Sequence, residues 1–159
     1  MTTSEYNLYL LTGIPGTGKT TFGNALANEF GFHHCDLEDT ATRNLLDKSP
    51  IEFVRKLARQ KRHTVVTWGF APDDEPSVQS VLYFKVNGFK LMWFDGNRPA
   101  ALRMFLKRGD VPELCFYKQM CKIEQSQIID RIKPTVIDPF DEHEQFKPPA
   151  EFLQEIKLK

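Results

Sequence analysis

The sequence carries no excess charge of either sign and little cysteine. Its 159 residues include 21 basic and 21 acidic side chains, which gives a formal net charge of +0. Without an overall positive field, the protein has no general means of attracting nucleic acid or an anionic membrane surface, so we expect neither as a partner. The three cysteines, Cys35, Cys115 and Cys121, are odd in number and lack CxxC spacing. They indicate reduced thiols and a cytoplasmic location, and they do not indicate a disulfide framework.

Long hydrophobic runs are also missing. No stretch approaches the ~20 apolar residues that a membrane-spanning helix needs, and the first residues, MTTSEYN, lack the features of a signal peptide. The adjacent His33, His34 and Cys35 do not predict a metal site, because neighbouring residues on a strand point to opposite faces. Hydrophobic residues make up 41% of the chain, which suffices for one buried core. We therefore expect a single domain over residues 1–159, as a monomer or weak dimer.

Short apolar runs alternate with amphipathic segments along the chain. Strands are predicted at residues 6–12, 32–35, 64–68, 89–94 and 135–137, and helices at residues 20–30, 40–61 with a break at Ser49-Pro50, 77–86 and 98–107. Asp110 and Glu113 have the spacing of a capping box, which predicts a further long helix to about Ile132. A closing helix follows Pro148-Pro149. This alternation predicts a three-layer α/β fold in which helices cover both faces of a five-stranded parallel sheet.

The strongest motif directly follows the first predicted strand. It matches the pattern G-x-x-x-x-G-K-S/T at every fixed position, and its residues are Gly13-Ile14-Pro15-Gly16-Thr17-Gly18-Lys19-Thr20, with Thr21 next. Glycines let the backbone approach a phosphate, and N–H groups of the loop and the helix start surround the anion. The lysine reaches the β- and γ-phosphates, and the hydroxyl of Thr20 is a ligand for Mg²⁺. The motif therefore predicts binding of ATP with Mg²⁺.

This motif on a first strand resembles the P-loop NTPases, and the short chain looks like their small-molecule kinases, the group of shikimate and gluconate kinase. The resemblance covers the order of elements over nearly the whole chain, and its specific motif is the phosphate loop. It implies a P-loop kinase-like fold with a short lid at about residues 103–116. It also implies transfer of the γ-phosphoryl group of ATP to a hydroxyl of a small metabolite.

Two acidic residues follow the second predicted strand. Shikimate kinases carry an Asp-x-Asp at this place, and here the residues are Asp36 and Glu38. The resemblance implies that Asp36 helps to hold Mg²⁺ and that Glu38 orients or deprotonates the acceptor hydroxyl. Residues two apart on an extended segment point the same way, and carboxylates suit both tasks. The sequence leaves a second interpretation open, in which this acidic segment with Asp39 only caps the helix that starts near Thr40.

The third predicted strand has no acidic residue at its end, whereas AAA-type ATPases carry an acidic pair there. In shikimate-type kinases this strand ends in glycines that approach the substrate. Here Trp68-Gly69-Phe70 offers one glycine between two aromatic residues. The two rings either line an apolar acceptor pocket or pack in the core. The acidic residues 73–75 lie between Pro72 and Pro76 and are predicted to form a solvated loop.

Arginines occur on the helix predicted at residues 98–107 and just after it. In the resembling kinases, an arginine on this helix stacks on adenine, and lid arginines contact the phosphates. By spacing, Arg103 corresponds to the first, and Arg108 is the nearest candidate for the second. A guanidinium is planar and forked, which suits both tasks, while a solvated helix face is the alternative. The resemblance also places the loop at residues 138–149 against the adenine base.

Two functions stay open on the sequence alone. The first is a phosphotransferase in which Lys19, Asp36, Glu38 and Arg108 act on ATP and a small metabolite. The second is a nucleotide-binding module with slow or partner-stimulated hydrolysis and no small-molecule acceptor, which the missing acid after the third strand favours. We prefer the first, because the chain length, the acid pair and the arginine-bearing helix all agree with it.

Overall fold

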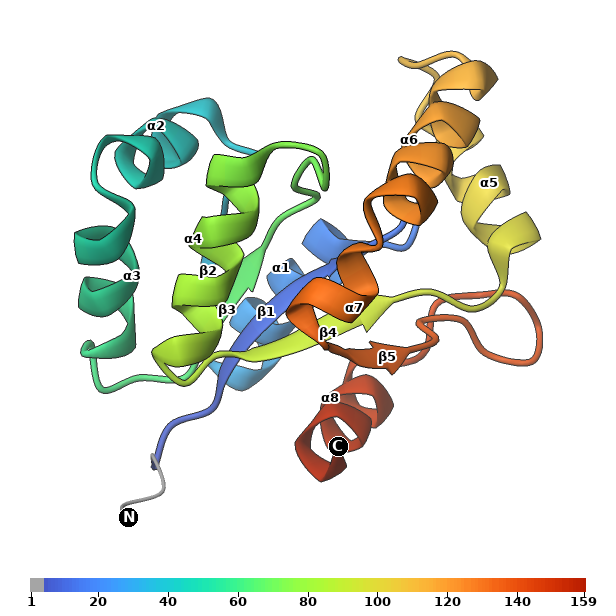
Figure 1. Cartoon of the computed structure of the whole chain (residues 1–159). Coiled ribbons are helices and arrows are strands. Elements are labelled where there is room, and N and C mark those ends of the chain that lie inside the picture. The colour runs from blue at the N-terminus through green and yellow to red at the C-terminus, as the bar shows by residue number, and fades with distance from the viewer. Residues whose placement is uncertain (1–4) are drawn as a thin grey trace.

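A computed structural model of the chain describes residues 5–159, and within them five parallel strands form one sheet (Figure 1). The strands are β1 (Leu8–Gly13), β2 (His33–Asp36), β3 (Thr64–Thr67), β4 (Lys90–Phe94) and β5 (Thr135–Ile137). Their order across the sheet is β2-β3-β1-β4-β5. The central strand β1 pairs with β3 on one side and with β4 on the other, so a crevice forms where these strands end. The predicted five-stranded parallel sheet is confirmed.

The helices lie on both faces of this sheet. They are α1 (Lys19–Phe30), α2 (Thr40–Lys48), α3 (Pro50–Ala58), α4 (Glu75–Val86), α5 (Arg98–Lys107), α6 (Glu113–Ser126), α7 (Ile128–Ile132) and α8 (Pro149–Leu158). Helices α1 and α8 cover one face, α3, α4 and α7 cover the other, and α5 and α6 stand together at one end (Figure 1). Among the described residues, no helix is both long and apolar enough to cross a membrane.

Alternate residues of β1 belong to two separate hydrophobic clusters. Leu8 and Leu10 pack under α3, α4 and α7, whereas Tyr9 and Leu11 pack under α1 and α8. Every residue of β1 from Leu8 to Thr12 is buried, as expected for a central strand of a parallel sheet that is covered on both faces. The sheet is therefore a rigid support for the loops at its carboxyl edge.

The helix predicted from Asp110 to Ile132 is wrong in two respects. Its first residue is Glu113, and Pro112 precedes it without a side-chain cap, while Asp110 forms an ion pair with Arg108. The helix ends at Ser126, and Gln127, with a positive φ of 53°, is the N-cap of the short helix α7. This break turns the chain so that Ile128 and Ile132, both fully buried, reach the core.

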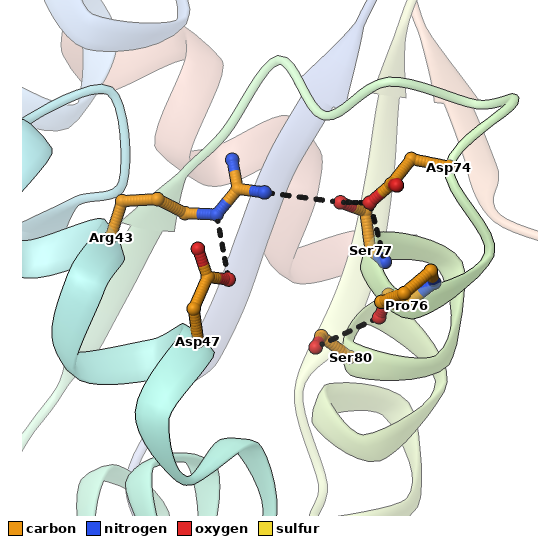
Figure 2. A network of polar contacts seen from close by, with 6 residues as sticks. All are labelled: Arg43, Asp47, Asp74, Pro76, Ser77 and Ser80. Atoms are coloured by element: carbon orange, nitrogen blue, oxygen red, sulfur yellow. Dashed lines mark hydrogen bonds and ion pairs between the residues drawn. The ribbon is translucent and has the colours of Figure 1, made fainter.

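The acidic residues 73–75 form a helix start, so the predicted solvated loop is wrong for Asp74 and Glu75. Asp74 is the N-cap of α4, and its Oδ2 accepts hydrogen bonds from the backbone N–H and the hydroxyl of Ser77. Figure 2 shows the same Ser77 hydroxyl accepting a hydrogen bond from Arg43 of α2. A capping aspartate next to a proline in the first helical turn explains this start. The network ties α2 to the start of α4.

Candidate functional site

The phosphate loop joins β1 to α1, and glycine is required for its shape. Gly16 and Gly18 have φ values of 78° and 75°, which L side chains rarely adopt. A Cβ atom at Gly16 would collide with the backbone carbonyl of Ala101 in α5. The loop therefore rests directly on the α5 backbone, with its N–H groups at the start of α1.

A cleft of about 630 Å³ opens beside this loop. The loop lines it with Gly13 and residues 15–21, while Ile14 is fully buried in the core. The other walls come from the segments after β2 and β3, from β4, from α5, α6 and the loop between them, and from the loop after β5. Their residues are Glu38, residues 68–72, Trp93, Met104, Phe105, Arg108, Val111, Gln119, Lys122, Ile123 and Phe146. The volume lies within the range of small-molecule sites.

Lys19 points back into its own loop. Its Nζ donates hydrogen bonds to the carbonyl of Ile14 at 2.8 Å and to Oγ1 of Thr17 at 3.4 Å. Burial lowers the pKa of Lys19 to about 8, against an opposing effect of Glu38 and with a further lowering by Arg108. An ammonium group that burial disfavours gains strongly from a nearby anion. The loop thus holds a cation ready for a phosphate.

This lowered pKa predicts proton uptake when ATP binds. At about pH 8.5 most of the free protein carries a neutral Lys19, and bound phosphates raise its pKa, so we expect about half a proton or more to be taken up per site. The measurement is the calorimetric binding enthalpy in buffers of different protonation enthalpy. At pH 7 the uptake should be small, because Lys19 is already charged. Equal uptake by Lys19→Met at pH 8.5 would contradict the assignment.

The two acids after β2 lie in different environments. Oε1 of Glu38 accepts a hydrogen bond from the backbone N–H of Gly69 at 2.5 Å, and a Cβ atom at Gly69 would lie 3.6 Å from Cε of Lys19. Glu38 therefore stands in the cleft wall near the loop lysine. Asp36 does not line the cleft, and its Oδ1 accepts hydrogen bonds from the Thr67 hydroxyl and the Glu38 N–H.

The helix cap is a different residue of the same segment. Oδ2 of Asp39 accepts hydrogen bonds from the backbone N–H of Thr42 at 3.0 Å and from its hydroxyl at 2.8 Å. Asp39 is thus the N-cap of α2, as the capping interpretation predicted. That interpretation does not extend to Asp36 and Glu38, since both bind other partners.

The chain offers oxygen donors of the kind that suit Mg²⁺. The described part of the chain contains no group of three or more His, Cys, Asp or Glu side chains that could enclose a metal ion. Mg²⁺ does not need such a cage, because it keeps several waters and binds through one or two carboxylates together with substrate phosphates. The hydroxyl of Thr20 and the carboxylate of Asp36 are hard oxygen ligands of this kind. The residues present therefore fit Mg²⁺ delivered with a nucleotide.

The aromatic residues after β3 pack in the core and also border the cleft. Trp68 is 1% exposed and Phe70 6%, so both belong to the core, and both also border the cleft. Phe70 lies edge-on to Trp93, with 6.4 Å between ring centroids. The guanidinium of Arg43, held by Asp47 as Figure 2 shows, lies 4.8 Å from the centroid of Trp68. The cleft thus has a fixed aromatic wall.

The two predicted arginines differ in position. Arg108 caps the end of α5 and lines the cleft, close enough to Lys19 to lower its pKa. Arg103 does not line the cleft and forms an ion pair with Glu144 in the loop after β5. That loop also brings Phe146 to the start of α1, where a Cβ atom at Gly18 would lie 2.7 Å from its ring.

Several cleft residues were missed by sequence reasoning. Phe146 comes from a loop without a recognisable pattern, and Gln119, Lys122 and Ile123 come from one face of α6. Their spacing is helical, but nothing in a single sequence tells which face of a surface helix borders a ligand site. Arg43, which does not line the cleft, was also missed, because its partners Ser77 on α4 and Trp68 just after β3 are distant in the chain.

Comparisons with known proteins agree with this geometry. The model of the family described as "ATPase family associated with various cellular activities (AAA)" matches residues 9–108. Among solved structures, a shikimate kinase from Bacteroides thetaiotaomicron has a TM-score of 0.64 at 16% identity, covering 96% of this chain and 99% of that one. A gluconokinase from Sinorhizobium meliloti 1021 has a TM-score of 0.58 at 16% identity, covering 94% and 88%.

A third similar structure, a shikimate kinase from Acinetobacter baumannii in complex with shikimate, has a TM-score of 0.58 at 16% identity and covers 98% of this chain and 92% of its own. At such identities the likeness concerns the fold. No curated protein sequence matches the chain. The family match covers the phosphate loop and the elements up to α5, whereas the structural likeness extends over nearly the whole chain.

Proposed function

We propose that this chain, which belongs to the ATPase family associated with various cellular activities (AAA) among the P-loop NTPases, is an ATP-dependent kinase of a small hydroxyl-bearing molecule. One observation carries the proposal: the carboxylate of Glu38 and the stem of Lys19 meet at Gly69, in a cleft that continues past the phosphate loop. A base beside the phosphate site, with further space beyond it, is the arrangement that transfer to an acceptor requires.

Binding of ATP falls to the phosphate loop and its surroundings. Gly13 and residues 15–21 would surround the phosphates with backbone N–H groups, with Lys19 near the γ-phosphate. Thr20 and Asp36 would hold Mg²⁺, which neutralises charge on the phosphate oxygens when it is bound. At the other end of the nucleotide, Arg103 and the loop at residues 138–149 would contact the base. Phe146 of this loop already lies at the start of α1.

The proposed transfer needs few groups from the protein. The acceptor oxygen forms a bond to the γ-phosphorus, the bond between that phosphorus and the β–γ bridging oxygen breaks, and ADP leaves with the electron pair. Glu38 accepts the proton of the acceptor hydroxyl. Lys19 and Arg108 stabilise the negative charge on the transferred group.

The residues that line the cleft also indicate which kind of acceptor it would bind. Many of the lining residues outside the phosphate loop are apolar or aromatic, and the ammonium group of Lys122 lies 3.7 Å from the carboxylate of Asp73. The arginines at positions 55, 59 and 62 are exposed and do not line the cleft. This supports an acceptor that presents an apolar or ring face together with its hydroxyl, and it disfavours a strongly anionic one.

A metabolite screen tests the proposed function. The purified protein is incubated with Mg²⁺ and ATP and with single metabolites, and ADP release and phosphorylated products are measured. We expect one chemical class to raise turnover strongly, with a product of 1:1 stoichiometry. Tight ATP binding without any metabolite response would instead support the regulatory nucleotide-binding module, which the absence of an acidic residue between Thr64 and Pro72 favours.

A lid over residues 103–116 makes a separate prediction. A kinase must admit ATP and then exclude water, which would otherwise accept the phosphoryl group. We expect a non-hydrolysable ATP analogue to increase hydrogen-exchange protection across residues 103–116, and Arg108→Ala to abolish most turnover. The side chain of Arg108 is 58% exposed, so it has room to move onto a phosphate. Unchanged exchange together with a fully active Arg108→Ala would disprove the lid.

A further inference from the structure

A chain of three polar side chains lies behind the phosphate loop. His34 and Asp36 are two residues apart on β2, and Thr67 is paired with Asp36 in the register of the neighbouring strand β3. Nε2 of His34 lies 2.7 Å from the Thr67 hydroxyl, which donates to Oδ1 of Asp36 at 3.1 Å. Thr67 is 1% exposed. Thr67 therefore stands at the end of β3, where the sequence has no acid, and it links that strand to the carboxylate on β2.

A neutral His34 ring satisfies this chain with one arrangement of the protons. The Thr67 hydroxyl has one proton and gives it to Asp36, so it must accept from Nε2–H of His34. The other ring nitrogen, Nδ1, lies 2.9 Å from Oδ1 of Asn24 on α1. A half-turn of that amide exchanges its oxygen and nitrogen and supplies the matching donor. Both ring nitrogens of His34 and the Thr67 hydroxyl then have partners, which fixes the ring.

The backbone of α1 leaves room for this ring. A Cβ atom at Gly23 would lie 2.5 Å from Nε2 of His34 and 2.7 Å from Cγ2 of Thr67. Gly23 and Asn24 follow Thr20 by three and four residues, so all three share one face of the helix. The same face that presents the Thr20 hydroxyl thus contacts His34 and Thr67. Asp36 is tethered through Thr67 beside this face.

The tether leaves one oxygen of Asp36 available. Within the described chain, both hydrogen bonds to its carboxylate end on Oδ1, from the Thr67 hydroxyl and from the Glu38 N–H at 3.0 Å. We propose that His34 and Thr67 are positioning residues that orient Asp36 for Mg²⁺ delivered with the nucleotide. This inference rests on the proposed function only in that it assigns Asp36 to the metal. Hydrogen-bonded partners of a metal ligand typically contribute 10–100-fold to metal affinity.

The test measures how strongly Mg²⁺ enhances ATP binding. ATP affinity is determined by calorimetry in EDTA and in saturating Mg²⁺, and the ratio of the two is compared between variants. Thr67→Val keeps the shape and removes the hydroxyl, so we expect the Mg²⁺ enhancement to fall at least about tenfold while ATP affinity in EDTA stays unchanged. Thr67→Ser restores the hydroxyl and should restore the enhancement. Thr64→Val, the same change at the other, equally buried end of β3, should behave as wild type.

Three outcomes would overturn the inference. One is wild-type Mg²⁺ enhancement in Thr67→Val; another is an equal loss in Thr67→Val and Thr67→Ser. The third is an equal loss of ATP affinity with and without Mg²⁺, which a purely structural role predicts. If Thr67→Val fails to fold, His34→Leu carries the same expectation, with His34→Gln as the donor-retaining control. Failure of the proposed kinase function is distinguishable, because it would appear as a wild-type protein that binds Mg²⁺ and ATP but phosphorylates no acceptor.

Discussion

Glu38→Gln is expected to slow phosphoryl transfer to the acceptor by roughly 10²–10⁴-fold, the usual contribution of a general base. Glutamine preserves the size of the side chain and an oxygen that can accept from the Gly69 N–H, so the local structure should persist. It cannot take the proton of the acceptor hydroxyl. The affinity for ATP should remain nearly unchanged. The measurement is acceptor-dependent ADP release, with ATP affinity determined in parallel.

A second acid variant separates the two carboxylates. Asp36→Asn should slow all ATP turnover, with and without acceptor, and should weaken its dependence on Mg²⁺, whereas Glu38→Gln should act mainly on transfer. Glu29→Gln, an exposed change at the far end of α1, serves as the control. If Asp36→Asn and Glu38→Gln both kept wild-type turnover with an identified acceptor, neither acid would be catalytic.

Lys19→Ala is expected to remove most of the stabilisation that Mg²⁺ and ATP confer. A ligand that binds only the native state raises the free energy of unfolding by about 2.7 kcal/mol at a hundredfold excess over its dissociation constant. The variant loses the ammonium group that contacts the phosphates, so its melting temperature should rise little on addition of the nucleotide. Lys48→Ala, an exposed change of equal charge on α2, should keep the full rise.

Without ATP, Lys19→Ala should not unfold more easily than the wild type. The pKa of Lys19 is about 8 in the folded protein against 10.5 for the unfolded group, so the unfolded state binds more protons between these values. Stability of the wild type therefore rises with pH through that range, and below pH 8 the charged lysine is an unfavourable feature of the empty protein. A large drop in melting temperature of ligand-free Lys19→Ala at pH 7 would show that the lysine is structural. An unchanged ATP-induced rise in this variant would contradict the phosphate-loop assignment.

The sequence predicted the parts of the site that are continuous in the chain. The phosphate loop could be identified because its residues are consecutive and because there is a physical reason for each residue type at its fixed position. The strands could be identified because β1 and β3 are short, apolar and followed by loop residues. The break after Ser126 could not, since it arises from the burial of Ile128 and Ile132 against a core formed by other segments.

The contacts that the sequence did not predict join residues that only folding brings together. Asn24, His34 and Thr67 lie on three different elements, and none of them matches a motif. Phe146 reaches Gly18 across most of the chain length. Even within one segment the sequence cannot assign roles. Asp36, Glu38 and Asp39 are all acidic, and only their different hydrogen-bond partners in the structure separate the cap of α2 from the other two.

The contact between Gly16 and Ala101 determines where α5 can bend. Because a single added carbon at Gly16 would strike the Ala101 carbonyl, and would lie 3.2 Å from Cβ of Phe105, the first two turns of α5 cannot swing without displacing the phosphate loop. The pivot of any closing motion therefore lies beyond Phe105. Gly109, with a φ of 70° and open space around its α-carbon, is the residue that can absorb the rotation. Arg108 would then stay on the fixed side of this pivot beside the loop, and α6 would move, carrying Gln119 and Lys122 across the mouth of the cleft.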